Sequence, residues 1–213
     1  MRTIRTTVDL KEGVAALVGS CGHLARVHAV AGDPPLRRRA AGFKGLALVI
    51  VGQQLSVASA GAIWGRLEAI AQPFAPASFV KLSAKDLRQA GLSAAKTATL
   101  RGVAAAIDAG SLDLDALTYA PEDVVHAKLT ALKGIGPWTA DIYILFCLAR
   151  ADAWSPGDLA LQVAVKDALA LKDRPGQPLM IEIAEVWRPW RAVAARMLWS
   201  YYALRRKLLD APA

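Results

Sequence analysis

The sequence predicts an all-α protein. Alanine and leucine recur at three- and four-residue spacing along most of the 213 residues, which is the period of a helix with one apolar face. No stretch alternates apolar and polar residues over the length of a strand. Glycine, proline, serine and aspartate interrupt the pattern at short intervals, as they do between helices. The expected helices cover residues 8–19, 43–71, 83–90, 94–109, 121–131, 137–149, 158–171 and 180–206.

Local signals agree with two of these helix starts. Ser83, with Asp86 three residues later, resembles a capping box in which aspartate replaces glutamate. Pro121 suits the first turn of the helix that follows it. Residues 171–180, "LKDRPGQPLM", are expected to form a loop because two prolines and a glycine interrupt the apolar pattern.

A second break indicates how the chain is organised. Residues 32–45, "GDPPLRRRAAGFKG", mix prolines, glycines and basic residues and are typical of a linker. We therefore expect residues 1–42 to form an N-terminal helical segment and linker that packs on a main body, residues 43–213. The chain is long enough for one full core or for two small lobes that share one cleft.

The chain is basic, with 26 Lys and Arg against 18 Asp and Glu, a net charge of +8 and an isoelectric point near 9.8. This balance favours an anionic partner, either nucleic acid or a membrane surface. Residues 45–65 carry no charge over a length that could cross a bilayer. Because Gln53, Gln54 and two serines interrupt them, a buried core helix is the preferred interpretation, and no membrane partner is expected.

The cysteines and the N-terminus indicate a compartment. Cys21 and Cys147 are too few for a disulfide framework or a cluster held by four thiolates. The first residues, "MRTIRTTVDLKEG", contain no apolar core of signal-peptide length. We expect a cytoplasmic monomer.

A glycine turn in "LKGIGPWTA", residues 132–140, is the first candidate site. Gly134 and Gly136 flank one apolar residue, and Pro137 suits the first turn of the next helix. Such a turn leaves amides pointing outward beside a helix N-terminus, so those of Gly134, Gly136 and Thr139 could bind one phosphate. The simpler interpretation is a tight turn between helices without a ligand. With its two flanking helices the stretch resembles the helix-hairpin-helix motif, which binds DNA backbone without reading sequence.

A lone carboxylate follows. "SPGDLAL" places Asp158 at the start of a helix, where the simplest role is an N-cap worth about 1 kcal/mol. A carboxylate held there by the helix dipole and amides is also suited to stabilise a developing sugar cation. Cap and catalyst can therefore be the same residue.

Hairpin, spacing and carboxylate together resemble the helix-hairpin-helix DNA glycosylase superfamily, and within it the 3-methyladenine DNA glycosylase II, or alkylbase, family. Three further stretches carry the resemblance, which spans about residues 43–205: "IVGQQLSVASAGAIW" from Ile50, "GLSAAKTATL" from Gly91 and "WRPWRAVAARMLW" from Trp187. It implies two helical lobes around a DNA- and base-binding cleft, in a compact form without the extra N-terminal domain of better-studied members.

The resemblance also implies an activity. A monofunctional glycosylase would flip an alkylated purine of the 3-methyladenine and 7-methylguanine class out of double-stranded DNA into an aromatic pocket. Asp158 would then stabilise the oxocarbenium-like sugar during hydrolysis of the N-glycosidic bond, as one step of base excision repair. Relatives that also cut the strand carry a lysine two residues after the second hairpin glycine, where this chain has Trp138. Lyase activity is therefore not expected.

By position in the family pattern, pocket residues would be Trp138, Trp199, Tyr143 and Trp190. DNA contacts would come from Gly134, Gly136, Thr139, Lys133, Gln53, Gln54, Leu55 and Lys96, with Gln54 as the wedge that fills the gap left by the flipped base. For Gln53 helix capping, for Leu55 core burial and for the lysines simple solvation are the alternatives. Arg188 and Arg191 are further candidate phosphate contacts.

No cofactor is expected to be required. Family hairpins often hold Na⁺ or K⁺ on backbone carbonyls, which would be those of Thr130, Leu132 and Ile135. Two other functions remain open: a non-catalytic helix-hairpin-helix DNA-binding module, and a glycosylase for a different lesion. Asp158 and the aromatic set argue against a pure binding module, because binding alone needs neither.

Overall fold

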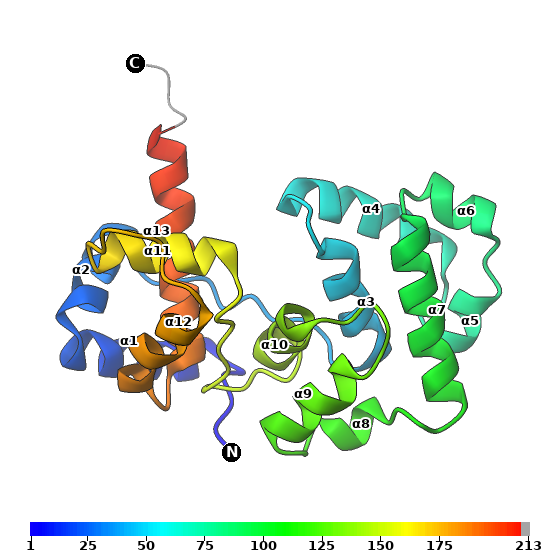
Figure 1. Cartoon of the computed structure of the whole chain (residues 1–213). Helices are drawn as coiled ribbons and strands as arrows, with labels where there is room; N and C mark the ends of the chain where they lie inside the picture. The colour runs from blue at the N-terminus through cyan, green and yellow to red at the C-terminus, as the bar shows by residue number, and fades with distance from the viewer. Residues whose placement is uncertain (210–213) are drawn as a thin grey trace. The chain divides into compact units, whose positions relative to one another are not determined.

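The computed structural model describes residues 1–209 (Figure 1). Within these residues the regular secondary structure consists of helices joined by turns and loops, apart from one isolated β-bridge between Thr3 and Arg150. The all-α prediction is confirmed. The chain divides into two compact units: unit 1 contains residues 1–38 and 149–213, and unit 2 contains residues 39–148. This grouping differs from the predicted division at residue 42, because both ends of the chain contribute to unit 1.

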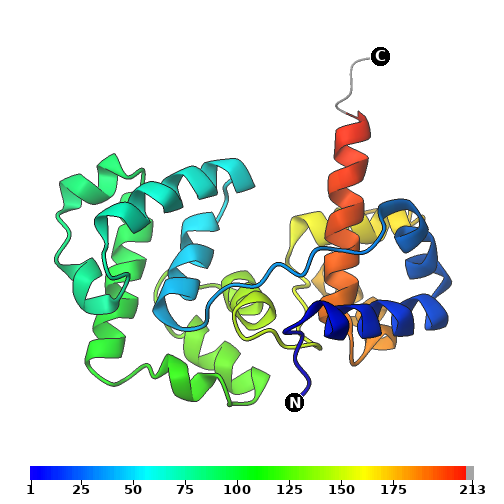
Figure 2. The same ribbon diagram turned by 180° about the vertical axis from the view of Figure 1, so that it is seen from behind.

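Unit 1 is built around the longest helix of the described residues, α13 (Arg191–Leu209). Helices α1 (Thr7–Ser20), α2 (Gly22–Ala31) and α11 (Leu159–Ala168) pack against α13, while α12 (Gln177–Ala184) leads into the 3₁₀ turn η1 (Glu185–Trp187). Ala192 to Ala195 and Leu198 have no exposed surface, so α13 is buried on all sides over its first turns. Its final turns extend beyond the neighbouring helices in both views (Figures 1 and 2).

Unit 2 contains the remaining helices. These are α3 (Gly42–Gly52), α4 (Val57–Ile70), α5 (Pro76–Val80), α6 (Ala84–Gln89), α7 (Ala94–Asp108), α8 (Leu114–Leu117), α9 (Glu122–Thr130) and α10 (Pro137–Phe146). Helix α3 forms the centre, where it packs against α4, α7, α8 and α10 with five of its side chains almost fully buried: Leu46, Ala47, Val49, Ile50 and Val51.

Two expected helices are each divided by a break that periodicity alone did not predict. The helix expected over residues 43–71 is two helices, because Gln54 adopts a left-handed conformation with φ 55° in the turn after α3. The helix expected over 180–206 is interrupted before Arg191, where Pro189 removes a backbone donor. No helix within residues 1–209 has the length and apolar character that crossing a bilayer requires.

Of the predicted helix starts, Ser83 is the N-cap of α6, with its hydroxyl oxygen accepting from the amide of Asp86. Pro121 instead occupies the N-cap position of α9, one residue before the helix, so its first-turn assignment was wrong.

Candidate functional site

The glycine turn connects α9 to α10 in unit 2. Gly134 has φ 88°, and a Cβ there would lie 1.9 Å from the Thr99 hydroxyl oxygen, so both conformation and space require glycine. Gly136 is the N-cap of α10 and offers no side-chain cap, while Pro137 is the first helical residue, as predicted. The turn therefore presents backbone, without side chains, at the positive end of a helix.

The amides of this turn divide into used and unused donors. Within residues 1–209, neither the Gly134 nor the Gly136 amide donates a hydrogen bond. The Thr139 amide donates to the Gly136 carbonyl at 3.0 Å, and the buried Thr139 hydroxyl accepts from Gln53. Two of the three amides predicted to bind phosphate are thus available, whereas Thr139 is committed to the first turn of α10. Lys133 is exposed on the same turn.

Two side chains of unit 2 hold this region: Gln53 contacts the glycine turn, and Lys96 contacts the end of α3, where Gln53 lies. The Gln53 amide nitrogen donates to the Gly134 carbonyl at 3.1 Å and to the Thr139 hydroxyl at 2.8 Å. The Lys96 ammonium donates at 2.8 Å to each of two carbonyls at the end of α3, those of Val51 and Gln53. Desolvation lowers the pKa of Lys96. Gln53 and Lys96 were predicted to contact DNA, and the structure instead makes them internal donors.

The predicted wedge lies in the short turn between α3 and α4. Gln54 is exposed in its left-handed conformation, and Leu55 next to it keeps 40% of its surface exposed. The alternative of core burial for Leu55 was therefore wrong. Because Gln53 immediately precedes this turn, its hydrogen bonds connect the wedge turn to the glycine hairpin, while Lys96 of α7 holds the backbone that leads into the turn, at Val51 and Gln53.

The predicted cation site uses backbone carbonyls of the same hairpin. Among residues 1–209 the Leu132 carbonyl accepts from the Ile135 amide, while no amide donates to the carbonyls of Thr130 and Ile135. The hydroxyl of Thr130 donates to the carbonyl of His126. Neutral oxygen ligands of this kind fit Na⁺ or K⁺. The residues present are thus compatible with the predicted ion.

Asp158 is the N-cap of α11 in unit 1, as its position in the sequence predicted. Its Oδ1 accepts from the Leu161 amide at 2.9 Å and from the Trp199 indole Nε1 at 3.1 Å. Only 9% of the residue is exposed. The Trp199 contact, which joins α13 to the start of α11, could not be read from local sequence. It makes the carboxylate part of a tertiary arrangement as well as a helix cap.

The four predicted pocket aromatics do not share one environment. Trp138 in unit 2 and Trp199 in unit 1 are each half-buried. Tyr143 has no exposed surface, its hydroxyl oxygen accepts from the Gly42 amide at 3.0 Å, and burial raises its pKa. Trp190 is also buried, with the Arg2 guanidinium 4.6 Å from its ring centroid. The pocket assignment of Tyr143 and Trp190 was wrong because both side chains belong to unit cores.

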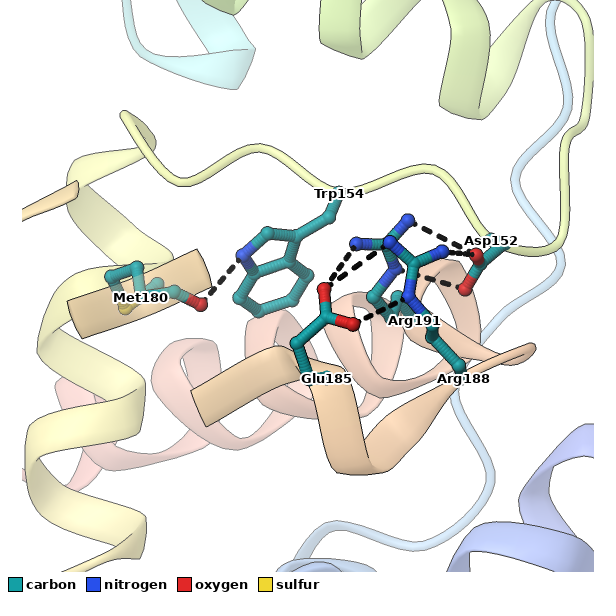
Figure 3. Close-up of polar contacts among 6 residues, drawn as sticks. All are labelled: Asp152, Trp154, Met180, Glu185, Arg188 and Arg191. Atoms are coloured by element: carbon teal, nitrogen blue, oxygen red, sulfur yellow. Dashed lines mark hydrogen bonds and ion pairs between the residues drawn. The ribbon is translucent and has the colours of Figure 1, made fainter. Parts of the chain in front are cut away.

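A cluster of charged residues lies beside the segment that leads to Asp158 (Figure 3). Asp152 accepts from Arg191 through both oxygens, at 2.9 and 3.0 Å, and also pairs with Arg188. Both arginines pair in addition with Glu185, and hydrogen bonding from Arg188 lowers the pKa of Glu185. Arg188 and Arg191 were predicted to contact phosphate, but their guanidinium groups are engaged with these carboxylates.

Comparisons with known proteins identify relatives of this chain. A family model described as "HhH-GPD superfamily base excision DNA repair protein" matches residues 47–189. Among curated proteins, a putative DNA-3-methyladenine glycosylase YfjP of Bacillus subtilis is 30% identical over 58% of this chain and 43% of its own length. DNA-3-methyladenine glycosylase 1 of Schizosaccharomyces pombe is 28% identical over 74% of this chain and 71% of its own. The chain thus spans less than half of the first relative's length.

Solved structures share the fold. The DNA-3-methyladenine glycosidase of Bacillus halodurans aligns with a TM-score of 0.78 and 33% identity, covering 97% of this chain and 95% of its own. The S. pombe 3-methyladenine DNA glycosylase Mag1, solved with abasic DNA, aligns with a TM-score of 0.84 and 24% identity, covering 95% of this chain and 100% of its own. The family model matches more than half of the chain, and the chain therefore belongs to the HhH-GPD superfamily of base excision DNA repair proteins.

Proposed function

We propose that the protein is a monofunctional DNA glycosylase that hydrolyses the N-glycosidic bond of alkylated purines in double-stranded DNA. The observation that carries this proposal is Asp158: a nearly buried carboxylate at the N-terminus of α11 whose Oδ1 accepts two N–H donors. Family membership and relatives named DNA-3-methyladenine glycosylases support the same activity.

An alkylated purine is a good leaving group, so its departure needs no strong general acid. Alkylation at the 3 or 7 position of a purine places a positive charge on the base, so the C1′–N bond breaks with its electron pair moving to the base. The sugar becomes an oxocarbenium-like cation, which the Asp158 carboxylate stabilises electrostatically. Water then adds to C1′ and loses a proton, leaving a free alkylated base and an abasic site in an uncut strand.

The two N–H donors fix the direction of this carboxylate. The Leu161 amide comes from the first turn of α11 and the Trp199 indole from α13, so two separate elements determine where Oδ1 lies. The positive end of the α11 dipole also lies beside it. Catalysis through charge stabilisation depends on such fixed geometry, since the group then need not reorganise as the sugar charge develops.

The hairpin in unit 2 supplies a candidate phosphate site. The unused amides of Gly134 and Gly136, at the N-terminus of α10, can donate hydrogen bonds to one phosphate group, and exposed Lys133 adds a positive charge on the same turn. These contacts involve no base edge, so they would bind DNA of any sequence. A monovalent cation on the carbonyls of Thr130, Leu132 and Ile135 would add positive charge near that phosphate.

The remaining assignments follow from the same proposal. Trp138 and Trp199 are candidate pocket residues, because an electron-rich ring attracts a cationic base by roughly 0.5 to 2 kcal/mol. Trp138 also occupies the position of the lysine that strand-cutting relatives use, and an indole forms no Schiff base. Exposed Gln54 and Leu55 are the candidate wedge that fills the gap left by the flipped base.

The test compares two substitutions of Asp158 on methylated duplex DNA. Asp158→Asn removes the charge, and Asp158→Ser removes the carboxylate while keeping a hydroxyl that can cap α11. We expect wild-type protein to release 3-methyladenine and 7-methylguanine, with strand breaks only after alkali, and both variants to be strongly impaired. Asp113→Asn is the matched control, since Asp113 is also an aspartate N-cap, of α8 in unit 2.

Each outcome has a distinct meaning. Release by wild type and by Asp113→Asn alone supports a glycosylase that uses Asp158. Equal release by wild type and both Asp158 variants would show that Asp158 is only a cap. Tight DNA binding without any release would replace the glycosylase with a binding module or an enzyme for another lesion.

A further inference from the structure

The segment that carries Asp158 is fixed at nearly every residue. We call residues 149–158 the carboxylate loop. The Ala149 carbonyl accepts from the Ile4 amide at 2.7 Å, and the Ala151 amide donates to the Arg2 carbonyl at 3.1 Å. The Ala151 carbonyl in turn accepts from the Ala192 amide of α13 at 3.0 Å. The first half of the loop is therefore held between the N-terminal residues and the start of α13.

The second half of the loop is held by side chains. The Trp154 indole nitrogen donates to the Met180 carbonyl at 3.0 Å (Figure 3). The Trp154 ring also meets that of Trp187 edge to face, with 5.5 Å between ring centroids. Ser155 has no exposed surface, and the Pro156 carbonyl accepts from Gln162. The loop also contains three charged residues: Arg150, which is buried, Asp158 itself, and Asp152 between them.

Asp152 forms a bidentate ion pair with Arg191 at the start of α13. Its two oxygens accept from two nitrogens of one guanidinium, that of Arg191, in the bidentate arrangement that is among the strongest charge-assisted contacts. The side chains are only 24% and 12% exposed. Isolated ion pairs at full exposure contribute little to stability. A partly buried bidentate pair instead holds its two side chains in one orientation.

Arg191 and Trp199 belong to the same helix. Arg191 begins α13 and contacts Asp152, and Trp199, eight residues further along, contacts Asp158. At 1.5 Å per residue the two positions are separated by about 12 Å along the helix axis. Two side chains of α13 therefore contact the carboxylate loop at points six residues apart in the loop, and the Ala192 amide adds a backbone contact beside the first of them. A shift of Asp152 relative to α13 would therefore change the orientation of Asp158 relative to Trp199.

We propose that the bidentate Asp152–Arg191 pair is a positioning device for base excision, which aligns the Asp158 carboxylate by anchoring the carboxylate loop to the start of α13. Asp152 and Arg191 are positioning residues that act through Asp158 and touch neither base nor sugar. This inference rests on the proposed function, because it assigns Asp158 the catalytic role argued above. It reassigns Arg191 from phosphate contact to support of the carboxylate.

The chain contains a matched control for the charge. Glu185 pairs with the same two arginines, but it lies on η1 rather than on the carboxylate loop and is 49% exposed. Glu185→Gln and Asp152→Asn each remove one negative charge from one cluster while keeping side-chain shape. Only the second substitution breaks the bidentate pair on the loop, because asparagine replaces one of the two acceptor oxygens by a donor. A difference between them therefore reports the anchoring of the loop and not the charge of the cluster.

The experiment measures the single-turnover rate of base release with protein in excess over methylated duplex DNA. The same variants are measured for Kd on duplex containing a tetrahydrofuran abasic analogue, and for Tm. We expect Asp152→Asn to slow release roughly tenfold to hundredfold, because small misplacement of a catalytic group has effects of this size. Kd should stay unchanged, and Glu185→Gln should keep the wild-type rate.

Two further variants separate positioning from folding. Arg191→Lys keeps the charge but loses the fork, so its rate should lie between those of wild type and Arg191→Gln. In an Asp158→Asn background, Asp152→Asn should cause no further loss, since its effect passes through the missing carboxylate.

The outcomes distinguish this inference from the proposed function. If wild type releases no base, the proposed function fails. If wild type is active but Asp152→Asn is as fast as Glu185→Gln, only the positioning role is overturned. The positioning role would also be overturned if the slower rate of Asp152→Asn were explained by weaker DNA binding or by a larger unfolded fraction. A further loss of rate in the Asp158→Asn background would overturn it as well.

Discussion

The two units differ in whether ion pairs help to hold their functional segments. In unit 2 the hairpin is held by Gln53, which donates to the Gly134 carbonyl, and Lys96 donates in turn to the Gln53 and Val51 carbonyls. In unit 1 the carboxylate loop also has backbone bonds and side-chain donors to its carbonyls, but ion pairs among Asp152, Arg188 and Arg191 hold it in addition. The support in unit 2 leaves backbone amides exposed to bind a phosphate, and the support in unit 1 orients one carboxylate, that of Asp158.

The difference follows from what each segment must present. A phosphate site made of amides cannot tolerate nearby carboxylates, so side-chain donors that end on carbonyls are a suitable support. A lone carboxylate needs orientation by N–H donors, and the residues around it can carry charge provided that their charges are paired. Substitutions that remove one kind of support should therefore have different consequences in the two units.

The largest effect is expected at the hairpin glycine. Gly134→Ala would force alanine into φ 88° and place its Cβ 1.9 Å from the Thr99 hydroxyl oxygen. A left-handed non-glycine residue costs about 1 to 2 kcal/mol and overpacking about 1 to 3, so we expect the free energy of unfolding to fall by about 3 kcal/mol. Denaturant unfolding measures this loss.

The matched control is the other glycine of the same turn. Gly136 has φ −93°, and a Cβ there meets no atom within 4 Å, so Gly136→Ala should leave stability almost unchanged. Adding Thr99→Ala to Gly134→Ala should recover part of the lost free energy by making space. Equal stability of the two single variants would mean that the hairpin does not need its left-handed glycine.

The next largest effect distinguishes Lys96 from Lys133, which were both predicted to contact phosphate. Lys96→Met should lower the free energy of unfolding by about 2 kcal/mol, because two carbonyls at the end of α3 lose a charged donor. It should leave the salt dependence of DNA affinity unchanged. Lys133→Met should have the reverse pattern, with normal stability and a salt slope reduced by about one. A reduced slope for Lys96→Met would restore the sequence-based prediction of a phosphate contact.

Local rules predicted the features that depend on neighbours in the chain. Pro137 at the first position of α10, the glycine turn and the Asp158 cap all follow from short-range preferences. Burial of Tyr143, in the second half of α10, and of Trp190, just before α13, could not be predicted this way, because tertiary packing decides which aromatic side chains are covered.

Long-range partners account for the remaining errors. Asp152 and Arg191 are 39 positions apart, and Lys96 lies 45 positions from Val51, so neither pairing has a local signature. A basic side chain looks the same in sequence whether it meets phosphate or an internal acceptor. The division of residues 43–71 at Gln54 was missed for a related reason, since glutamine in a left-handed turn carries no glycine or proline signal.

A smaller effect is expected when Asp158 loses the hydrogen bond from the Trp199 indole. Trp199→Phe removes the indole N–H that donates to Asp158 Oδ1 at 3.1 Å and keeps an aromatic ring. Loss of one such hydrogen bond is worth about 1 kcal/mol, so we expect a few-fold slower single-turnover base release. Trp64→Phe, on α4 in unit 2, is the control for loss of an indole. An unchanged rate would show that the Trp199 indole is not needed to orient the carboxylate.

The smallest effect uses one thiol in each unit as a probe. Cys21 is half-exposed, whereas Cys147 is buried and its pKa is raised to about 12 by desolvation. Because the thiolate is the reactive form, a disulfide reagent at pH 8 should modify Cys21 rapidly and Cys147 only when unit 2 opens. Gly134→Ala should therefore accelerate labelling of Cys147, and Asp152→Asn, which disturbs unit 1, should not. Faster Cys147 labelling in both variants would mean that the two units open together, and the contrast between their supports would then not extend to their stability.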